Sequence, residues 1–143
     1  MGGLIAKTLD NVRRGRMQRL LAAATAFSAP PLAFEIYLEH EKGSWGDKWM
    51  WTPIWLTPPL TAAGVAGFLS PKAARTVLPL FGALYALDGA IGVLTHFQGV
   101  RKRPGGFGEA HYNLVMGPPL LAPGSLAMVG AMGVLAAIMK RER

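Results

Sequence analysis

Histidines and carboxylic acids are the side chains in this sequence with the clearest capacity for chemistry. The histidines are His40, His96 and His111, and the acids in or beside the same apolar stretches are Glu35, Glu39 and Asp88. Neutral imidazoles and carboxylates together form ligand sets for zinc, copper or non-haem iron. Two histidines from different helices can also hold a haem between them. We therefore predict a haem or transition-metal site with the three histidines as ligands, and with the three acids supporting those ligands or handling protons.

The spacing of these residues identifies no known catalytic motif. There is no His-Glu-x-x-His, Glu-x-x-His or Cys-x-x-Cys-His pattern, and no serine or threonine sits in a nucleophile elbow. The chain has no cysteine, which excludes disulfides, thiolate metal sites and iron–sulfur clusters. The glycine-rich stretch 105–108 follows no predicted strand, so it is not a phosphate-binding loop. The sequence favours a protein that is not an enzyme.

Asp88 and Glu35 stand out among the acids because both fall inside apolar segments. Asp88 is predicted near the middle of its segment, and Glu35 about a turn and a half from the end of its own. Ionisable groups are costly inside a membrane and usually functional there. A pair of this kind is typical of a proton-coupled carrier. The alternative is structural, with the two acids hydrogen bonded to nearby tyrosines or threonines.

The elements that carry these residues are predicted to be membrane helices. The chain has 143 residues, of which 51% are hydrophobic and only 16% charged, and its mean hydropathy is positive. This composition is too apolar for a soluble domain of this size. The formal charge of +7 is concentrated at the ends and loops of apolar runs, which suits lipid headgroups better than nucleic acid. We predict an all-α integral membrane protein.

Four apolar segments are long enough to cross a hydrocarbon core of about 30 Å. They cover residues 20–40, 50–69, 76–98 and 113–139, so residues 20–143 form one four-helix transmembrane domain. Residues 1–19 form a short basic amphipathic segment that we place on the membrane surface. The run 13–16 followed by 20–27 also resembles a twin-arginine or secretory signal, but it continues into a full-length span. Small residues, including Gly89 with Gly92 and Gly130 with Gly133, predict close contacts between the helices.

Three proline pairs interrupt these segments. The pairs are Pro30 with Pro31, Pro58 with Pro59, and Pro118 with Pro119. Proline removes a backbone donor and kinks a helix, and membrane helices tolerate it where neighbours satisfy the freed carbonyls. We therefore predict kinks in the halves of the helices that also carry the histidines. Broken helices and acids in one half are typical of a cavity or binding site within a membrane.

The distribution of basic residues predicts the orientation. Most lysines and arginines lie at the two termini and in the loop 70–75, and fewer lie in the loops 41–49 and 99–112. The positive-inside rule then places both termini in the cytoplasm and all three histidines on the opposite face of a plasma (inner) membrane. All four tryptophans fall between residues 45 and 55, which indicates half of an aromatic belt at that face.

These patterns leave three functions open. The first is a small integral subunit of a larger bioenergetic or redox complex, either respiratory or photosynthetic, which would have other membrane subunits and the lipid bilayer as partners. The second is a haem- or metal-binding redox protein that uses the three histidines. The third is a proton-coupled transporter that uses Asp88 and Glu35, and four helices would then require a homodimer. The absence of a catalytic motif and the small-residue faces favour the first.

Overall fold

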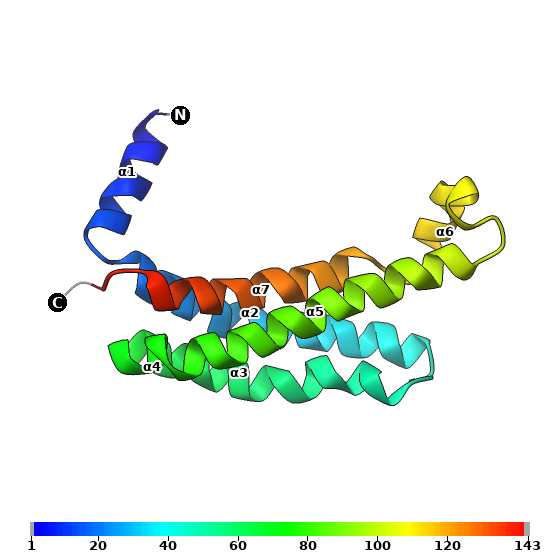
Figure 1. Ribbon diagram of the computed structural model, residues 1–143, viewed down its shortest axis with the longest axis horizontal. Coiled ribbons are helices and arrows are strands. Elements are labelled where there is room, and N and C mark those ends of the chain that lie inside the picture. Colours follow the sequence, from blue (N-terminus) through cyan, green and yellow to red (C-terminus); the bar gives the residue numbers. More distant parts are fainter. Residues whose placement is uncertain (1, 142–143) are drawn as a thin grey trace.

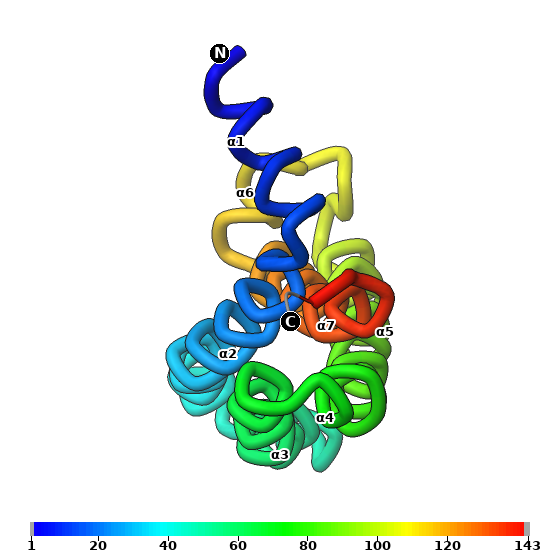
Figure 2. The backbone as a smooth tube through the Cα atoms, turned by 90° about the vertical axis from the view of Figure 1, so that its left-hand side faces the viewer, coloured from blue at the N-terminus to red at the C-terminus, as the bar shows by residue number. Residues whose placement is uncertain are grey.

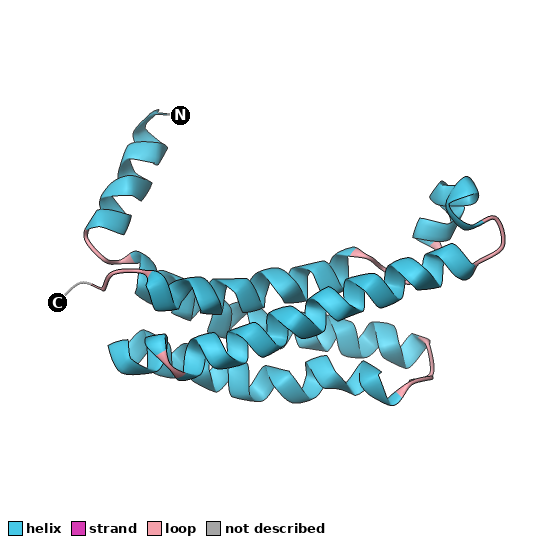
Figure 3. Ribbon diagram, viewed as in Figure 1, coloured by secondary structure: helices cyan, strands magenta, loops and turns pink. Residues whose placement is uncertain are grey.

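Helices form the whole secondary structure of the computed structural model, which describes residues 2–141. No strand is present in that range (Figure 3). Arg143, one of the basic residues used above to predict orientation, lies outside it. The α-helices are α1 (Gly2–Arg13), α2 (Met17–Lys42), α3 (Thr52–Leu69), α4 (Pro71–Arg75), α5 (Val77–Lys102), α6 (Ala110–Val115) and α7 (Leu121–Ile138). Two 3-10 turns, η1 (Lys48–Trp51) and η2 (Gly106–Glu109), precede α3 and α6.

Four of the helices, α2, α3, α5 and α7, run side by side as an up-and-down bundle (Figure 1). Figure 2 looks along the bundle and shows the ring order α2, α3, α5, α7, in which α7 closes back onto α2. The short helix α4 turns the chain between α3 and α5. Ser70 begins this turn, because its hydroxyl accepts a hydrogen bond from the Ala73 amide. As its short link predicts, α3 lies antiparallel beside α5.

Three helices of the bundle, α2, α5 and α7, are long and apolar enough to cross a membrane. The prediction of an all-α chain with membrane-spanning helices is supported to this extent. The fourth, α3, has 18 residues and is not among them. Its prolines and threonines lower its mean hydropathy, although at about 1.5 Å per residue its length is close to the hydrocarbon thickness.

The three proline pairs do not behave alike. The pairs at 30–31 and 58–59 lie inside α2 and α3, and both helices continue through them. The third pair, Pro118 and Pro119, lies in a non-helical segment between α6 and α7. The predicted span 113–139 is therefore two helices, and α7 begins only at Leu121. Proline disfavours a helical conformation in the residue before it, so the glycine and two prolines at 117–119 end the helix rather than bend it.

A glycine seam joins α5 to α7, and we use this name for Gly82, Gly89 and Gly130. A β-carbon at Gly89 would lie 2.4 Å from the Ala127 amide nitrogen. A β-carbon at Gly130 would lie 2.4 Å from the Ala86 amide nitrogen. Backbones can approach this closely only where side chains are missing. The predicted close packing through small residues is confirmed here.

Polar side chains tie the helices together at the end of the bundle that holds the termini. Gln18 is fully buried at the start of α2. Its Nε2 donates to the carbonyl oxygen of Ala136 in the last turn of α7 (2.9 Å) and to that of Met139, the residue after α7 (3.1 Å). Arg141 donates to the carbonyl oxygens of Gly67 (2.7 Å) and Phe68 at the end of α3. These bonds satisfy carbonyls that the helix ends leave open.

Two segments project from the bundle on the same side. Helix α1 leaves it at the end with the termini, and η2 with α6 leaves it at the opposite end (Figures 1 and 2). No residue of α1 is buried, and its apolar residues Leu4, Ile5 and Leu9 are exposed. Ile5 and Leu9 lie on the opposite face of α1 from Lys7, as the amphipathic pattern predicts.

Candidate functional site

The structure brings two of the three predicted histidines together. His40 near the end of α2 and His96 on α5 have ring centroids 6.4 Å apart, with the ring planes at 83°. The Nδ1 atom of His96 lies 2.7 Å from the carbonyl oxygen of Pro119. A carbonyl can only accept, so His96 Nδ1 is the donor, which in the neutral imidazole leaves Nε2 as the nitrogen with a lone pair. The Nδ1 atom of His40 is buried and has no hydrogen-bond partner in the structure.

The third histidine does not join this pair. His111 is exposed on α6, and no group of three His, Cys, Asp or Glu residues within the described range 2–141 could hold a metal ion. The predicted three-histidine site is therefore not formed. The reason is the length of α5, which continues six residues past His96 to Lys102. At about 1.5 Å per residue this carries the following loop and α6 some 9 Å beyond the pair.

An aromatic cluster formed by Tyr37, Trp45 and Trp51 lies against the His40 side of the pair. The rings of Trp45 and Trp51 stack with centroids 3.9 Å apart, and Tyr37 contacts both. The His40 ring lies 5.4 Å from the Trp45 ring, so the cluster is continuous with the histidines. Trp45 adopts a left-handed backbone conformation (φ 48°), which is uncommon outside glycine. Its stacking and a hydrogen bond from its Nε1 to Glu41 hold it there.

The remaining tryptophans and the acids of α2 face outward. Trp49 and Trp55 are 68% and 72% exposed, as expected for an aromatic belt. Glu39 forms an ion pair with Lys42 (2.5 Å), and Glu35 is exposed. No interaction joins Glu35 to Asp88 within the described residues, so the structure does not form the predicted pair of titrating acids.

Asp88 instead bonds to a hydroxyl at the beginning of α3. Thr52 donates from Oγ1 to Asp88 Oδ1 over 2.6 Å. Thr52 is the first residue of α3 and directly follows Trp51, so Asp88 lies level with the tryptophan-rich segment. Asp88 lies near the middle of α5, as predicted from the sequence. Its carboxyl group nevertheless lies beside the first residue of the neighbouring helix α3.

An open groove of about 300 Å³ runs between α3 and α5 at this level. Its walls are apolar apart from the carboxyl and hydroxyl groups at one edge. It is lined by Thr52, Trp55, Leu56, Leu84, Leu87, Asp88 and Ile91. About one turn before Asp88 in α5, the buried Tyr85 hydroxyl lies 2.9 Å from Thr57 Oγ1. Thr57 Oγ1 in turn donates to the Pro53 carbonyl oxygen. The groove thus has a polar edge beside a closed hydrogen-bond network.

Sequence reasoning missed two polar positions of this end. Thr52 is 36 residues from Asp88, and no local pattern indicates that they meet. Asn113 is 1% exposed, and its Nδ2 donates to the carbonyl oxygens of Pro104 (2.9 Å) and Gly106 (2.7 Å), so that it closes the loop after α5. Asn113 lies inside α6, five residues before Pro118, and no local pattern indicates its role.

The fold and the site define a class: an all-helical protein with three candidate membrane-spanning helices and a histidine and aromatic cluster at one end of its bundle. Comparison with protein-family models, with curated proteins and with solved structures gives no match.

Proposed function

We propose that this chain is a small integral membrane subunit of a larger bioenergetic or redox assembly. In this proposal α3 crosses the membrane together with α2, α5 and α7, and the prolines inside α2 and α3 bend those helices. Both termini face the cytoplasm, because basic residues are most frequent at that end of the bundle. The membrane is the plasma or inner membrane. The histidine and aromatic cluster then lies at the opposite surface.

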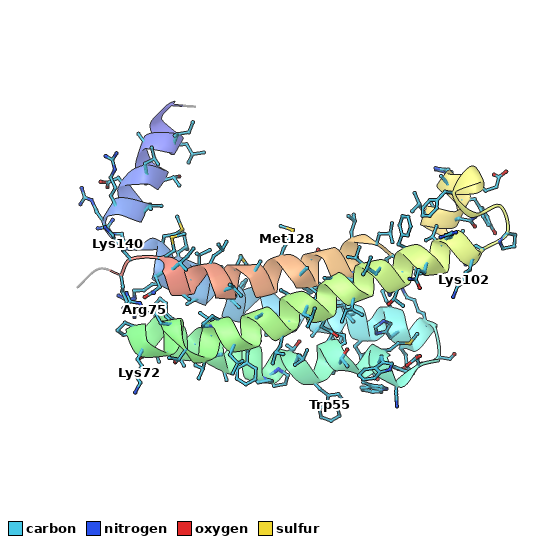
Figure 4. The ribbon with its side chains drawn as sticks, in the orientation of Figure 1. Trp55, Lys72, Arg75, Lys102, Met128 and Lys140 are labelled. Atoms are coloured by element: carbon cyan, nitrogen blue, oxygen red, sulfur yellow. The ribbon has the colours of Figure 1, made fainter. Side chains whose placement is uncertain are left out.

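The observation that carries the proposal is the exposed face of α7 between the two projecting segments. Leu121, Met128 and Leu135 recur every seven residues on α7 and are 85%, 71% and 44% exposed. Residues at this spacing lie along one side of a helix. Met128 points toward the side on which α1 and α6 project (Figure 4). An apolar stripe with a projecting segment at each end fits a partner membrane helix lying along α7.

Helix α1 supports the same arrangement. Its apolar side has no partner within the described residues, while Lys7 lies on its other side and Arg13 and Arg14 make its final end basic. Such a helix lies in the headgroup region of anionic lipid. From that position it would cover one end of a partner helix that packs against α7.

Site-specific photo-crosslinking in native membranes tests this proposal. A photoreactive residue at Met128 is expected to capture a discrete protein partner. The matched position is Trp55, which is equally exposed but points to the opposite side of the bundle (Figure 4). It is expected to capture lipid. Capture of the same protein from both positions, or only of a second copy of this chain at Met128, would contradict the proposal.

A second candidate function rests on the His40–His96 pair. Two histidines are a complete set of protein ligands for haem, whereas a metal ion would need a further ligand from water or a partner. The carbonyl of Pro119 orients His96 in the way that backbone carbonyls commonly orient ligating histidines. An oxidised-minus-reduced absorbance spectrum with elemental analysis tests it. This function is supported if the protein shows a haem absorbance band or a bound metal that is lost in His96→Ala and kept in His111→Ala. A colourless, metal-free protein excludes it.

A further inference from the structure

We propose that the groove between α3 and α5 binds an amphiphile that carries a protonated amine. The amine pairs with the Asp88 carboxylate, and the hydrocarbon part lies along the apolar wall formed by Leu84 and Leu87. This site lies on a different side of the bundle from the α7 face, so it does not depend on the proposed subunit role.

The first argument is charge. Thr52 is the only group that bonds to Asp88 within the described residues, and no lysine, arginine or histidine there forms an ion pair with it. A hydroxyl supplies one hydrogen bond and no charge. A carboxylate beside apolar walls requires a positive partner or a proton, because removing it from water is costly. A ligand ammonium supplies that partner with hydrogen bonds as well as charge.

The second argument is the shape and chemistry of the groove. It is open to the side, and apart from Asp88 and Thr52 its lining is Trp55, Leu56 and aliphatic side chains. Its volume of about 300 Å³ is at the lower end of small-molecule sites. A soluble polar cation would gain nothing from these walls, whereas an alkyl chain would pack against them at no polar cost.

The third argument is the position of the polar edge. Asp88 lies level with Thr52, next to the tryptophans that mark a membrane interface. An amphiphile in a bilayer holds its charged group at this depth and its chain further in. Trp55, which is 72% exposed, lines the same groove and belongs to this tryptophan-rich segment.

The experiment uses the full-length chain in a non-ionic detergent and n-dodecylamine as the probe. Tryptophan fluorescence reports binding, because Trp55 lines the groove. The uncharged control ligand is n-dodecanol, which has the same chain length. The variant is Asp88→Asn, which keeps an acceptor oxygen for Thr52 and removes the charge. The matched control variant is Glu35→Gln, which removes an exposed acid from α2.

Saturable binding of n-dodecylamine is expected for the unmodified chain and for Glu35→Gln. Asp88→Asn is expected to weaken it about tenfold or more, the scale of a lost charge pair in a partly buried site. Equal isotherms for n-dodecylamine and n-dodecanol, or for the unmodified chain and a folded Asp88→Asn, would overturn the proposal. If Asp88→Asn fails to fold, Leu87→Trp decides instead, because it fills the groove and leaves the carboxylate; retained binding would then refute the site.

Competition in nanodiscs identifies the source of the amine. Phosphatidylethanolamine carries a primary ammonium, whereas phosphatidylglycerol carries none. Displacement of n-dodecylamine by the first lipid alone assigns the groove to a lipid headgroup. Undiminished binding in both lipids assigns it to a free lipophilic amine. Displacement by both lipids equally would mean that the amine is not recognised, which contradicts the proposal.

Discussion

Replacing Gly130 with alanine tests whether the glycine seam holds α5 against α7. The added methyl group would lie 2.4 Å from the Ala86 amide nitrogen, 2.5 Å from the Gly82 carbonyl oxygen and 2.8 Å from the Ala86 α-carbon. All three atoms belong to the backbone of α5. No side-chain rotation can relieve the overlap, so the two helices must separate.

The size of the effect follows from these distances. Ordinary contacts of a β-carbon begin at 3.4 Å, so α5 and α7 must separate by about 1 Å at this point. A gap of that size forfeits a quarter to a half of each dispersion contact beside it. Overpacking costs about 3 kcal/mol at the upper end of its usual range, and alanine returns about 1 kcal/mol as the better helix former. We expect Gly130→Ala to lower the free energy of unfolding by about 2 kcal/mol.

Unfolding by sodium dodecyl sulfate from mixed micelles measures this change, with circular dichroism and tryptophan fluorescence as the readouts. The control is Gly124→Ala in the same helix, where the nearest atom to the new methyl group is a Val93 carbon 4.0 Å away. That variant is expected to match or exceed the stability of the unmodified chain. Equal stability of the two variants would refute the reasoning, because they differ only in what the methyl group meets.

Three further predictions concern hydrogen bonds of buried side chains. Gln18→Ala removes the ties to the end of α7 and is expected to cost about 1–3 kcal/mol in the same unfolding assay, since two carbonyls lose their donor; no loss would mean that water replaces the amide. Thr57→Val and Tyr85→Phe each remove one partner of a buried bond, so a double-mutant cycle is expected to give a coupling energy of about 1 kcal/mol, and additive effects would show that the bond contributes nothing. Asn113→Ala releases the loop after α5, and trypsin is expected to cleave after Lys102 several times faster than in the unmodified chain, with unchanged cleavage at Arg14 as the internal reference.

Apolar length predicts the long helices well and their ends poorly. The expected segments 20–40 and 76–98 correspond to α2 and α5. Helix α2 is longer than predicted at both ends, and α5 is longer at its final end. The basic residues Arg101 and Lys102 were assigned to a loop because of their charge. They are helical, since cations in the last turn interact favourably with the helix dipole. This extension is also what separates His111 from the other two histidines.

The candidate site was predictable only in its parts. The common end of the bundle for His40 and His96 follows from topology, because the two helices have known directions and similar lengths. Contact between Asp88 and Thr52 depends on the rotation of each helix about its own axis and on where α3 begins. A proline pair that a helix continues through also looks the same in a sequence as a pair at which a helix ends. Those outcomes depend on which neighbouring helices satisfy the freed carbonyls.

The glycine seam determines how this chain can change over evolutionary time. Where one backbone lies against another, as at Gly89 and Gly130, every other residue type requires the helices to separate. Exposed positions such as Phe27 on α2 need only remain apolar and can change freely. A distant homologue would therefore be recognised less by overall similarity than by small residues at these fixed spacings, in two apolar segments separated by a connection that ends in a proline pair.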